Sequence, residues 1–198
     1  MKDLPIYKMV LSDDPEITGV EYMALVDRPA MGVDFVKFAE ATRFKTQDEV
    51  KQVVSGPIMI PDQLIYRFDE KKGEYYLTAD RAVIEKTVLR FSKLGNFAKV
   101  NIQHDENNIV DDVFMFESFI IDRSKGILPT EFSDLPDGTW FGSYKIDNEQ
   151  VWKDYISTGR LKGFSLEGYY GHELKTEPVK LCWIDEFLSD TEKVIREI

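Results

Sequence analysis

Short runs of apolar residues, many of them alternating with polar residues, predict a chain built mostly of β-strands. The runs have the length of strands and are separated by stretches of turn-forming residues. Residues 64–78 predict a β-hairpin with its turn at Asp69 to Gly73. Further strands are predicted at 5–12, 19–26, 53–61, 98–105, 111–122, 138–146 and 163–174.

The period changes to that of a helix in residues 78–95. Apolar side chains recur there at i, i+4 and i+7, which are the positions of Ile84, Val88 and Phe91. Thr78 or Asp80 can cap the start of this helix, and Gly95 can end it. These signals together predict one well-defined helix near the middle of the chain.

Two further segments predict shorter helices. Residues 147–159 begin with Asp147 as a capping residue and end at Gly159. The C-terminal residues 189–198 predict a helix that is capped by Ser189.

The order of these elements predicts an α+β protein. The helices do not alternate one for one with the strands, so an antiparallel or mixed sheet is favoured over a doubly wound sheet. The length of 198 residues fits one domain with an additional arm. We expect residues 1–52 to form N-terminal strands, an arm and a connector, and residues 53–198 to form the main domain.

Composition and charge exclude several classes of function. Hydrophobic residues make up 43% of the chain and aromatic residues 13%, which is enough for a packed core. The net charge of −11 repels phosphate backbones, so we expect no nucleic-acid partner. The N-terminus lacks the apolar run of a signal peptide, and no stretch reaches the length of a membrane span. We therefore expect a cytosolic protein without a membrane partner.

The sequence predicts neither a cofactor nor a metal site. The single cysteine, Cys182, stands beside Trp183 in an apolar run and is interpreted as a core residue. One cysteine and two histidines do not provide a zinc-ligand spacing, and the EF-hand, P-loop and G-x-G-x-x-G patterns are missing from the sequence. No G-x-S-x-G elbow surrounds a serine, which disfavours an α/β-hydrolase and hence a small-molecule hydrolase.

A serine and a histidine remain as candidates for chemistry. Ser165 lies in the predicted strand 163–174, and a serine hydroxyl needs a base to become a nucleophile near neutral pH. His104 and His172 are the two histidines of the chain. Surface positions on a strand and in a polar turn explain Ser165 and His104 equally well, so the residues by themselves indicate no more than a possible Ser/His pair.

The phrases VNIQHDE, FESFIID and GTWFGSYKIDNEQVWKDYISTGRLKGFSLEGYY occur in this order between residues 53 and 170. In order and spacing they resemble the XkdF-like serine proteases of tailed phages and prophages. That group is similar to the prohead maturation proteases, which are related in fold to the herpesvirus assembly proteases. The resemblance implies a compact, mostly antiparallel, β-barrel-like domain with surrounding helices.

The resemblance also implies roles for particular residues. A histidine comes first in those families, and the serine nucleophile follows in a later strand. Carried onto this sequence, His104 is the base and Ser165 is the nucleophile. Glu117 is the favoured third residue, because its strand is expected to pair with the strand of His104. His172, Asp105 or no third residue at all are the alternatives.

The biological setting follows from the resemblance as well. It implies a protease that acts in the host cytoplasm, inside the immature phage head, on scaffold and capsid polypeptides, with a homo-oligomer as a possible form. The N-terminal arm is a candidate for self-processing. A non-enzymatic head-assembly or capsid-associated protein with the same fold is the alternative function.

Overall fold

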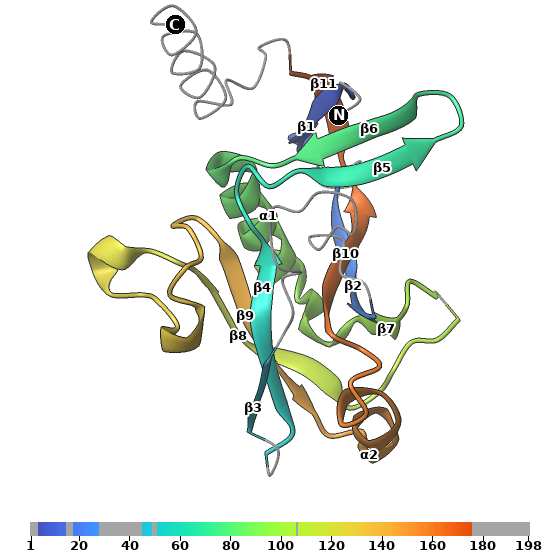
Figure 1. Ribbon diagram of the computed structural model, residues 1–198, viewed down its shortest axis with the longest axis vertical. Helices are drawn as coiled ribbons and strands as arrows, with labels where there is room; N and C mark the ends of the chain where they lie inside the picture. The colour runs from blue at the N-terminus through green and yellow to red at the C-terminus, as the bar shows by residue number, and fades with distance from the viewer. Residues whose placement is uncertain (1–3, 15–17, 28–44, 49–50, 106, 176–198) are drawn as a thin grey trace, which may run out of the picture.

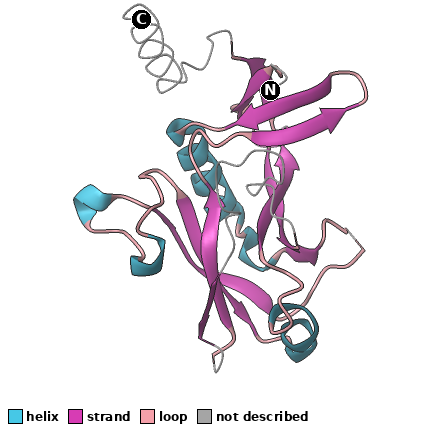
Figure 2. Cartoon of the chain, in the orientation of Figure 1, coloured by secondary structure: helices cyan, strands magenta, loops and turns pink. Residues whose placement is uncertain are grey.

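The computed structural model describes residues 4–14, 18–27, 45–48, 51–105 and 107–175. These residues form three β-sheets and two α-helices, with several short helical turns in the connections (Figures 1 and 2). The predicted helix 189–198, Cys182 and most of the N-terminal arm lie outside the described residues.

The first sheet has the strand order β11–β1–β6–β5. Strands β5 and β6 form the predicted hairpin, and Asp69 accepts hydrogen bonds from the amides of Lys71 and Lys72 at 2.9 and 3.0 Å in its turn. Gly73 ends the turn with a φ of 74°, a conformation that favours glycine. The bounds are β1 (Ile6–Val10), β5 (Ile65–Asp69), β6 (Gly73–Thr78) and β11 (Gly171–Leu174).

The second sheet has the order β10–β2–β7, with β2 (Gly19–Val26) in the centre. Strand β10 (Gly163–Tyr169) runs antiparallel to β2, and the short β7 (Val100–Ile102) runs parallel to it. Strand β10 is thus an edge strand of this sheet, and one of its long sides is not bonded to another described strand.

The third sheet has the order β3–β4–β9–β8. Its strands are β3 (Lys45–Asp48), β4 (Val53–Met59), β8 (Val113–Ile120) and β9 (Trp140–Ile146). Strand β3 lies in a segment for which the sequence predicted a connector. It pairs with β4. The pairing of β8 differs from the prediction too: β8 pairs with β9, whereas β7 pairs with β2.

The long helix α1 (Arg81–Leu94) has the boundaries that its sequence signals predict. Asp80 caps it by accepting a hydrogen bond from the amide of Val83 at 2.9 Å, and Gly95 ends it with a φ of 69°. The start of α2 (Glu149–Val151) was predicted wrongly, because Asn148 and not Asp147 accepts the capping hydrogen bonds. Helix α2 continues into a π-helical turn at Trp152–Ile156.

The core lies where α1 and the sheets meet (Figure 1). Phe91 of α1 packs against Trp140 of β9 with 5.2 Å between ring centroids, and Tyr144 packs against Phe164 of β10 at 4.8 Å. All four side chains are buried. Aromatic packing of this kind fixes β10 against the third sheet and so fixes the position of Ser165, which follows Phe164.

The prediction of a mixed, mostly antiparallel α+β fold is confirmed, with parallel pairing at β1–β6 and β2–β7. The described strands form three sheets that do not close into a barrel, so the barrel-like form is unconfirmed. The division at residue 52 stays a prediction, although β1 and β2 pair with strands from the later segment. Within the described ranges, none of the helices has the length and apolar character needed to span a membrane.

Candidate active site

Ser165 lies in the middle of β10, opposite Ala24 of β2. Its exposed fraction is 3%, and it lines a pocket of about 210 Å³. Among the described residues, none forms a hydrogen bond with its hydroxyl group. The hydroxyl is therefore available to a group that enters the pocket.

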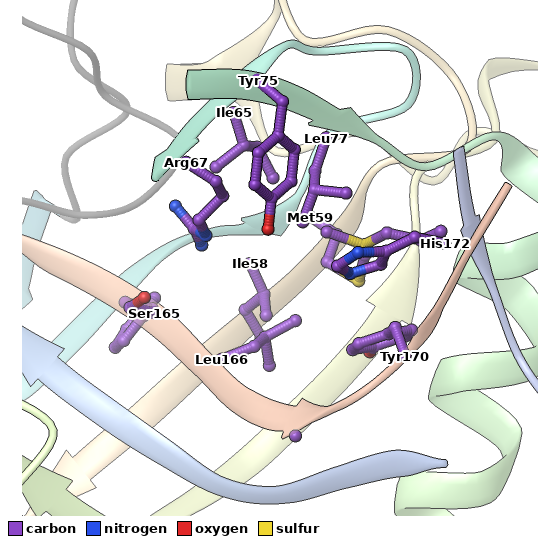
Figure 3. Close-up of a pocket in the computed structure, with 13 residues that line it drawn as sticks. Ile58, Met59, Ile65, Arg67, Tyr75, Leu77, Ser165, Leu166, Tyr170 and His172 are labelled. Carbon is purple, nitrogen blue, oxygen red and sulfur yellow. The ribbon is translucent and has the colours of Figure 1, made fainter. Parts of the chain in front are cut away.

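Most of the walls of this pocket come from three parts of the fold, and β1 adds Met9 (Figure 3). Strand β10 and the residues after it form one side, the β5–β6 hairpin forms the opposite side, and β4 closes the base. Arg67 and Tyr75 extend from the hairpin toward β10, where Ser165 lies (Figure 3). The apolar lining residues are Met9, Ile58, Met59, Ile65, Leu77, Phe164 and Leu166.

His104 follows β7 at a point where the backbone leaves the sheet. Gln103 and His104 have φ values of 58° and 62°, in the left-handed region that residues other than glycine seldom adopt. The Gln103 amide donates to the carbonyl of Leu25 at 3.0 Å, which anchors the turn to β2. Consecutive residues in this conformation are held by their surroundings, and such positions are common at functional sites.

The His104 side chain contacts a carboxylate on the strand of Ser165. His104 Nδ1 lies 2.6 Å from Oε1 of Glu167, two residues after Ser165. Asn101 Nδ2 donates to Oε2 of the same carboxylate at 2.9 Å. A carboxylate oxygen accepts, so Nδ1–H of the imidazole is the donor in this contact. The imidazole of His104 is thus oriented by Glu167, and the Glu167 carboxylate is oriented by both His104 and Asn101.

Strand geometry explains why these polar side chains gather. Side chains at i and i+2 of a strand point to the same face, about 7 Å apart, so Ser165 and Glu167 share a face of β10. In register, Ser165 lies opposite Ala24, and Ala24 lies opposite Asn101 of β7. The small Ala24 side chain leaves room for Glu167 and Asn101 to meet across β2. By register, Ser165, Glu167 and Asn101 share one face of the sheet, and His104 contacts that face through Glu167. His104, Glu167 and Asn101 are not among the lining residues of the pocket that Ser165 lines.

Glu117 lies in a different sheet from His104. It accepts a hydrogen bond from Ser143 Oγ at 2.5 Å, next to a bulge in β8. The expectation that its strand pairs with the strand of His104 was wrong, because β7 ends after three residues and pairs in parallel with β2. The catalytic role proposed for Glu117 from sequence is untested and has lost the strand pairing on which it was based.

The other two alternatives for a third residue also occupy defined places. His172 of β11 lines the Ser165 pocket at the end away from Ser165, and its Nδ1 lies 3.0 Å from Lys72 Nζ (Figure 3). Burial lowers the pKa of His172, and the Lys72 ammonium lowers it further. Asp105 accepts from the amide of Asn107 at 2.9 Å and so stabilises the turn after His104.

Sequence analysis missed Glu167 and Asn101 as members of this site. The alternation in Phe164 to Glu167 already places Ser165 and Glu167 on one face, which is a usable signal for Glu167. Asn101 gives no comparable signal, because its contact depends on the parallel pairing of β7 with β2.

Comparison with known proteins agrees with the resemblance seen in the sequence. A family model described as "Putative phage serine protease XkdF" matches residues 41–173, more than half of the chain. The chain belongs to this family. The match includes β10 with Ser165 and Glu167, and the turn with His104. Comparison with curated proteins gives no match, and comparison with solved structures gives none either.

Proposed function

We propose that this protein is a serine endopeptidase in which Ser165 is the nucleophile and His104 is the base. The observation that carries the proposal is the contact between His104 and Glu167, because it holds an imidazole at the strand face that presents Ser165. Membership of a family described as phage serine proteases supports the same reaction class.

In the proposed reaction, Ser165 Oγ forms a bond to the carbonyl carbon of a peptide while its proton passes to His104 Nε2. His104 then returns the proton to the leaving amine as the carbon–nitrogen bond breaks. Water, activated by the same imidazole, attacks the acyl-enzyme and frees Ser165. Each step uses the imidazole first as a base and then as an acid.

Glu167 is proposed as the third residue in place of Glu117. Its carboxylate accepts from His104 Nδ1 at 2.6 Å, which selects the tautomer with a free Nε2 and stabilises the imidazolium that forms during attack. Asn101, which is fully buried, donates to the other carboxylate oxygen and limits its rotation. Glu167 and Asn101 act as positioning residues in this proposal.

The proposed substrates are scaffold and capsid polypeptides of a phage, cleaved inside the immature head in the host cytoplasm. Family membership supports the association with phages. The edge position of β10 among the described strands supports polypeptide substrates, because an extended peptide can add to a strand edge beside the nucleophile.

A fluorophosphonate probe tests the proposed function directly. We expect the full chain to gain one phosphonyl group on Ser165, identified by mass spectrometry of the labelled peptide. His104→Ala is expected to lose labelling while it keeps its fold, as judged by circular dichroism. Equal labelling of the wild type and His104→Ala would contradict the proposed base, and an unlabelled wild type would contradict the nucleophile.

The second candidate is a non-enzymatic head-assembly protein with the same fold. The low exposure of Ser165, 3%, favours it, since a nucleophile must be reached by its substrate. In that case His104 and Glu167 form an ion pair that holds the turn after β7 to β10. Failure of the wild type to react with the probe at any concentration is the result that this candidate predicts.

A further inference from the structure

The pocket beside Ser165 contains a guanidinium group for which the described residues provide no acidic partner. Within the described part of the chain, Arg67 makes one hydrogen bond, from Nη1 to the carbonyl of Tyr66 at 3.0 Å, and forms no ion pair. A guanidinium has five N–H donors in a planar fork that matches a carboxylate. The described residues therefore use only a small part of the donor capacity of Arg67.

Strand register directs Arg67 into the pocket. Arg67 of β5 lies directly opposite Tyr75 of β6, so the two side chains share one face of the hairpin. Both extend from the hairpin toward β10, and both line the same pocket as Ser165 (Figure 3). A molecule in this pocket can contact the guanidinium, the Tyr75 hydroxyl and the serine together.

We infer that Arg67 binds an acidic side chain of the substrate, at a residue next to the bond that Ser165 cuts. This inference rests on the proposed function. An Asp or Glu side chain would extend its methylene groups past Ile65 and Leu77 and place its carboxylate on the guanidinium. Two parallel N–H···O bonds then replace the solvent that both charges lose.

Burial of Arg67 supports an anionic occupant. Burial lowers the pKa of the guanidinium, which remains protonated at neutral pH because the ordinary value is so high. A charge that is removed from water without a partner is costly, and a bound carboxylate offsets that cost. An apolar or cationic side chain in the same place would leave the guanidinium unpaired.

A second cation, Lys72, lies next to the pocket, although it is not among the lining residues. At the end away from Ser165, Lys72 Nζ lies 3.0 Å from His172 Nδ1 and 5.6 Å from the centre of the Tyr75 ring. The hairpin also carries Asp69, Glu70 and Glu74, and none of these carboxylates is among the lining residues of the pocket. Asp69 accepts from backbone amides in the turn, and Glu74 accepts from the Tyr66 hydroxyl at 2.9 Å. A cationic pocket in a chain of net charge −11 is complementary to an acidic substrate residue.

Protection of Ser165 from a neutral fluorophosphonate tests the inference. The labelling rate of the full chain is measured with added N-acetylglutamate methylamide or with its neutral isostere, N-acetylglutamine methylamide, at equal ionic strength. The aspartate and asparagine pair is measured in the same way. We expect the acid to halve the rate at a concentration at least about tenfold lower than the amide. Because these competitors are single residues, they can bind on either side of the position of the scissile bond. The test therefore does not depend on which side Arg67 contacts.

Variants then assign the preference to Arg67. For each variant the rate without competitor is its own reference, and Arg67→Gln is expected to lose the preference for the acid over the amide. Arg67→Lys keeps the positive charge but lacks the planar guanidinium, so it should retain part of the preference for the acid. It replaces Arg67→Gln in the test if Arg67→Gln does not fold. Lys71→Gln removes a positive charge from the same hairpin, outside the pocket lining, and should retain the full preference.

The outcomes separate the inference from the proposed function. If Ser165 of the wild type does not react with the neutral probe, the proposed function fails and the inference fails with it. If Ser165 reacts but the acid protects no better than the amide, the inference alone is overturned. A preference for the acid that persists unchanged in both Arg67 variants also overturns it.

Discussion

Two serine–glutamate pairs occur in different sheets of this protein, and they differ in what the carboxylate contacts next. In the third sheet, Ser143 donates its hydrogen bond directly to Glu117 at 2.5 Å. In the second sheet, the Glu167 carboxylate contacts the imidazole of His104, and Ser165 has no such bond among the described residues. Serine and glutamate are thus hydrogen-bonded directly to each other in the third sheet, whereas in the second sheet the glutamate contacts a histidine instead.

The difference shows why residue types alone do not define a catalytic site. Carboxylates are weak bases toward a serine hydroxyl near neutral pH, whereas imidazole titrates in that range. The Ser143 hydroxyl is also committed on both sides, because it accepts from Ser55 Oγ at 2.8 Å while it donates to Glu117. We interpret that chain as structural, and the β10 face as the one suited to catalysis.

The largest expected effect comes from removing each serine hydroxyl in turn. Ser165→Ala removes the proposed nucleophile, so proteolysis should fall by on the order of 10⁴-fold or more. Ser143→Ala should change the rate by less than about threefold, since Ser143 lies in another sheet. Cleavage of a denatured protein substrate, followed by mass spectrometry, measures both. Loss of activity in Ser143→Ala, with Ser165→Ala still active, would reverse the assignment.

Replacement of each glutamate by glutamine should have the next largest effect. Glu167→Gln keeps the shape but removes the negative charge and one of the two acceptor oxygens, so the amide cannot accept from both Asn101 and His104. The labelling rate of Ser165 should therefore fall by about 10²- to 10⁴-fold. Glu117→Gln should label at nearly the wild-type rate. Glu167→Asp should restore part of the lost rate, which a purely structural role would not require. A larger loss in Glu117→Gln than in Glu167→Gln would return Glu117 to the site.

The sequence predicted local features of the fold better than contacts between distant segments. The hairpin turn at Asp69 and both ends of α1 follow from turn and capping residues that act within a few positions. The start of α2 was predicted one residue early, because Asp147 and Asn148 are both good capping residues and the sequence does not distinguish them.

The strand pairing expected for Glu117 was wrong, while its catalytic role stays a prediction. The prediction of Glu117 assumed that strands adjacent in sequence pair with each other, which is common but not general. Here the left-handed residues Gln103 and His104 turn the chain away from β7, which pairs instead with β2. The contact between His104 and Glu167 depends on this pairing, and no local pattern encodes it.

Stability should respond to the two serines in the opposite order from activity. Ser143→Ala breaks hydrogen bonds of a fully buried hydroxyl, so we expect it to lower the free energy of unfolding by about 1–3 kcal/mol. Ser165→Ala breaks no hydrogen bond with a described residue and should change it by less than about 0.5 kcal/mol. Urea unfolding followed by circular dichroism measures both. Equal destabilisation would mean that Ser165 is as firmly bonded as Ser143.

The smallest expected effect is a pH dependence of stability that arises from His172. Burial and the Lys72 ammonium lower the pKa of His172 in the folded protein, so the unfolded chain takes up the proton first as the pH falls. The contribution is fully present above the unfolded value of about 6.5 and is lost as the pH decreases through that value. The half-exposed side chain and the opposing charge of Asp69 keep the effect small.

His172→Gln should therefore flatten the decline in unfolding free energy between about pH 7.5 and pH 5.5, relative to the wild type. Carboxylates titrate in both proteins, so their contribution cancels when the unfolding free energies of His172→Gln and the wild type are subtracted. A decline that is steeper in His172→Gln would show that the imidazole gains a proton on folding, and would place an uncompensated anion in the pocket. Such an anion would also compete with the substrate carboxylate for Arg67, so this small measurement bears on the charge of the whole pocket.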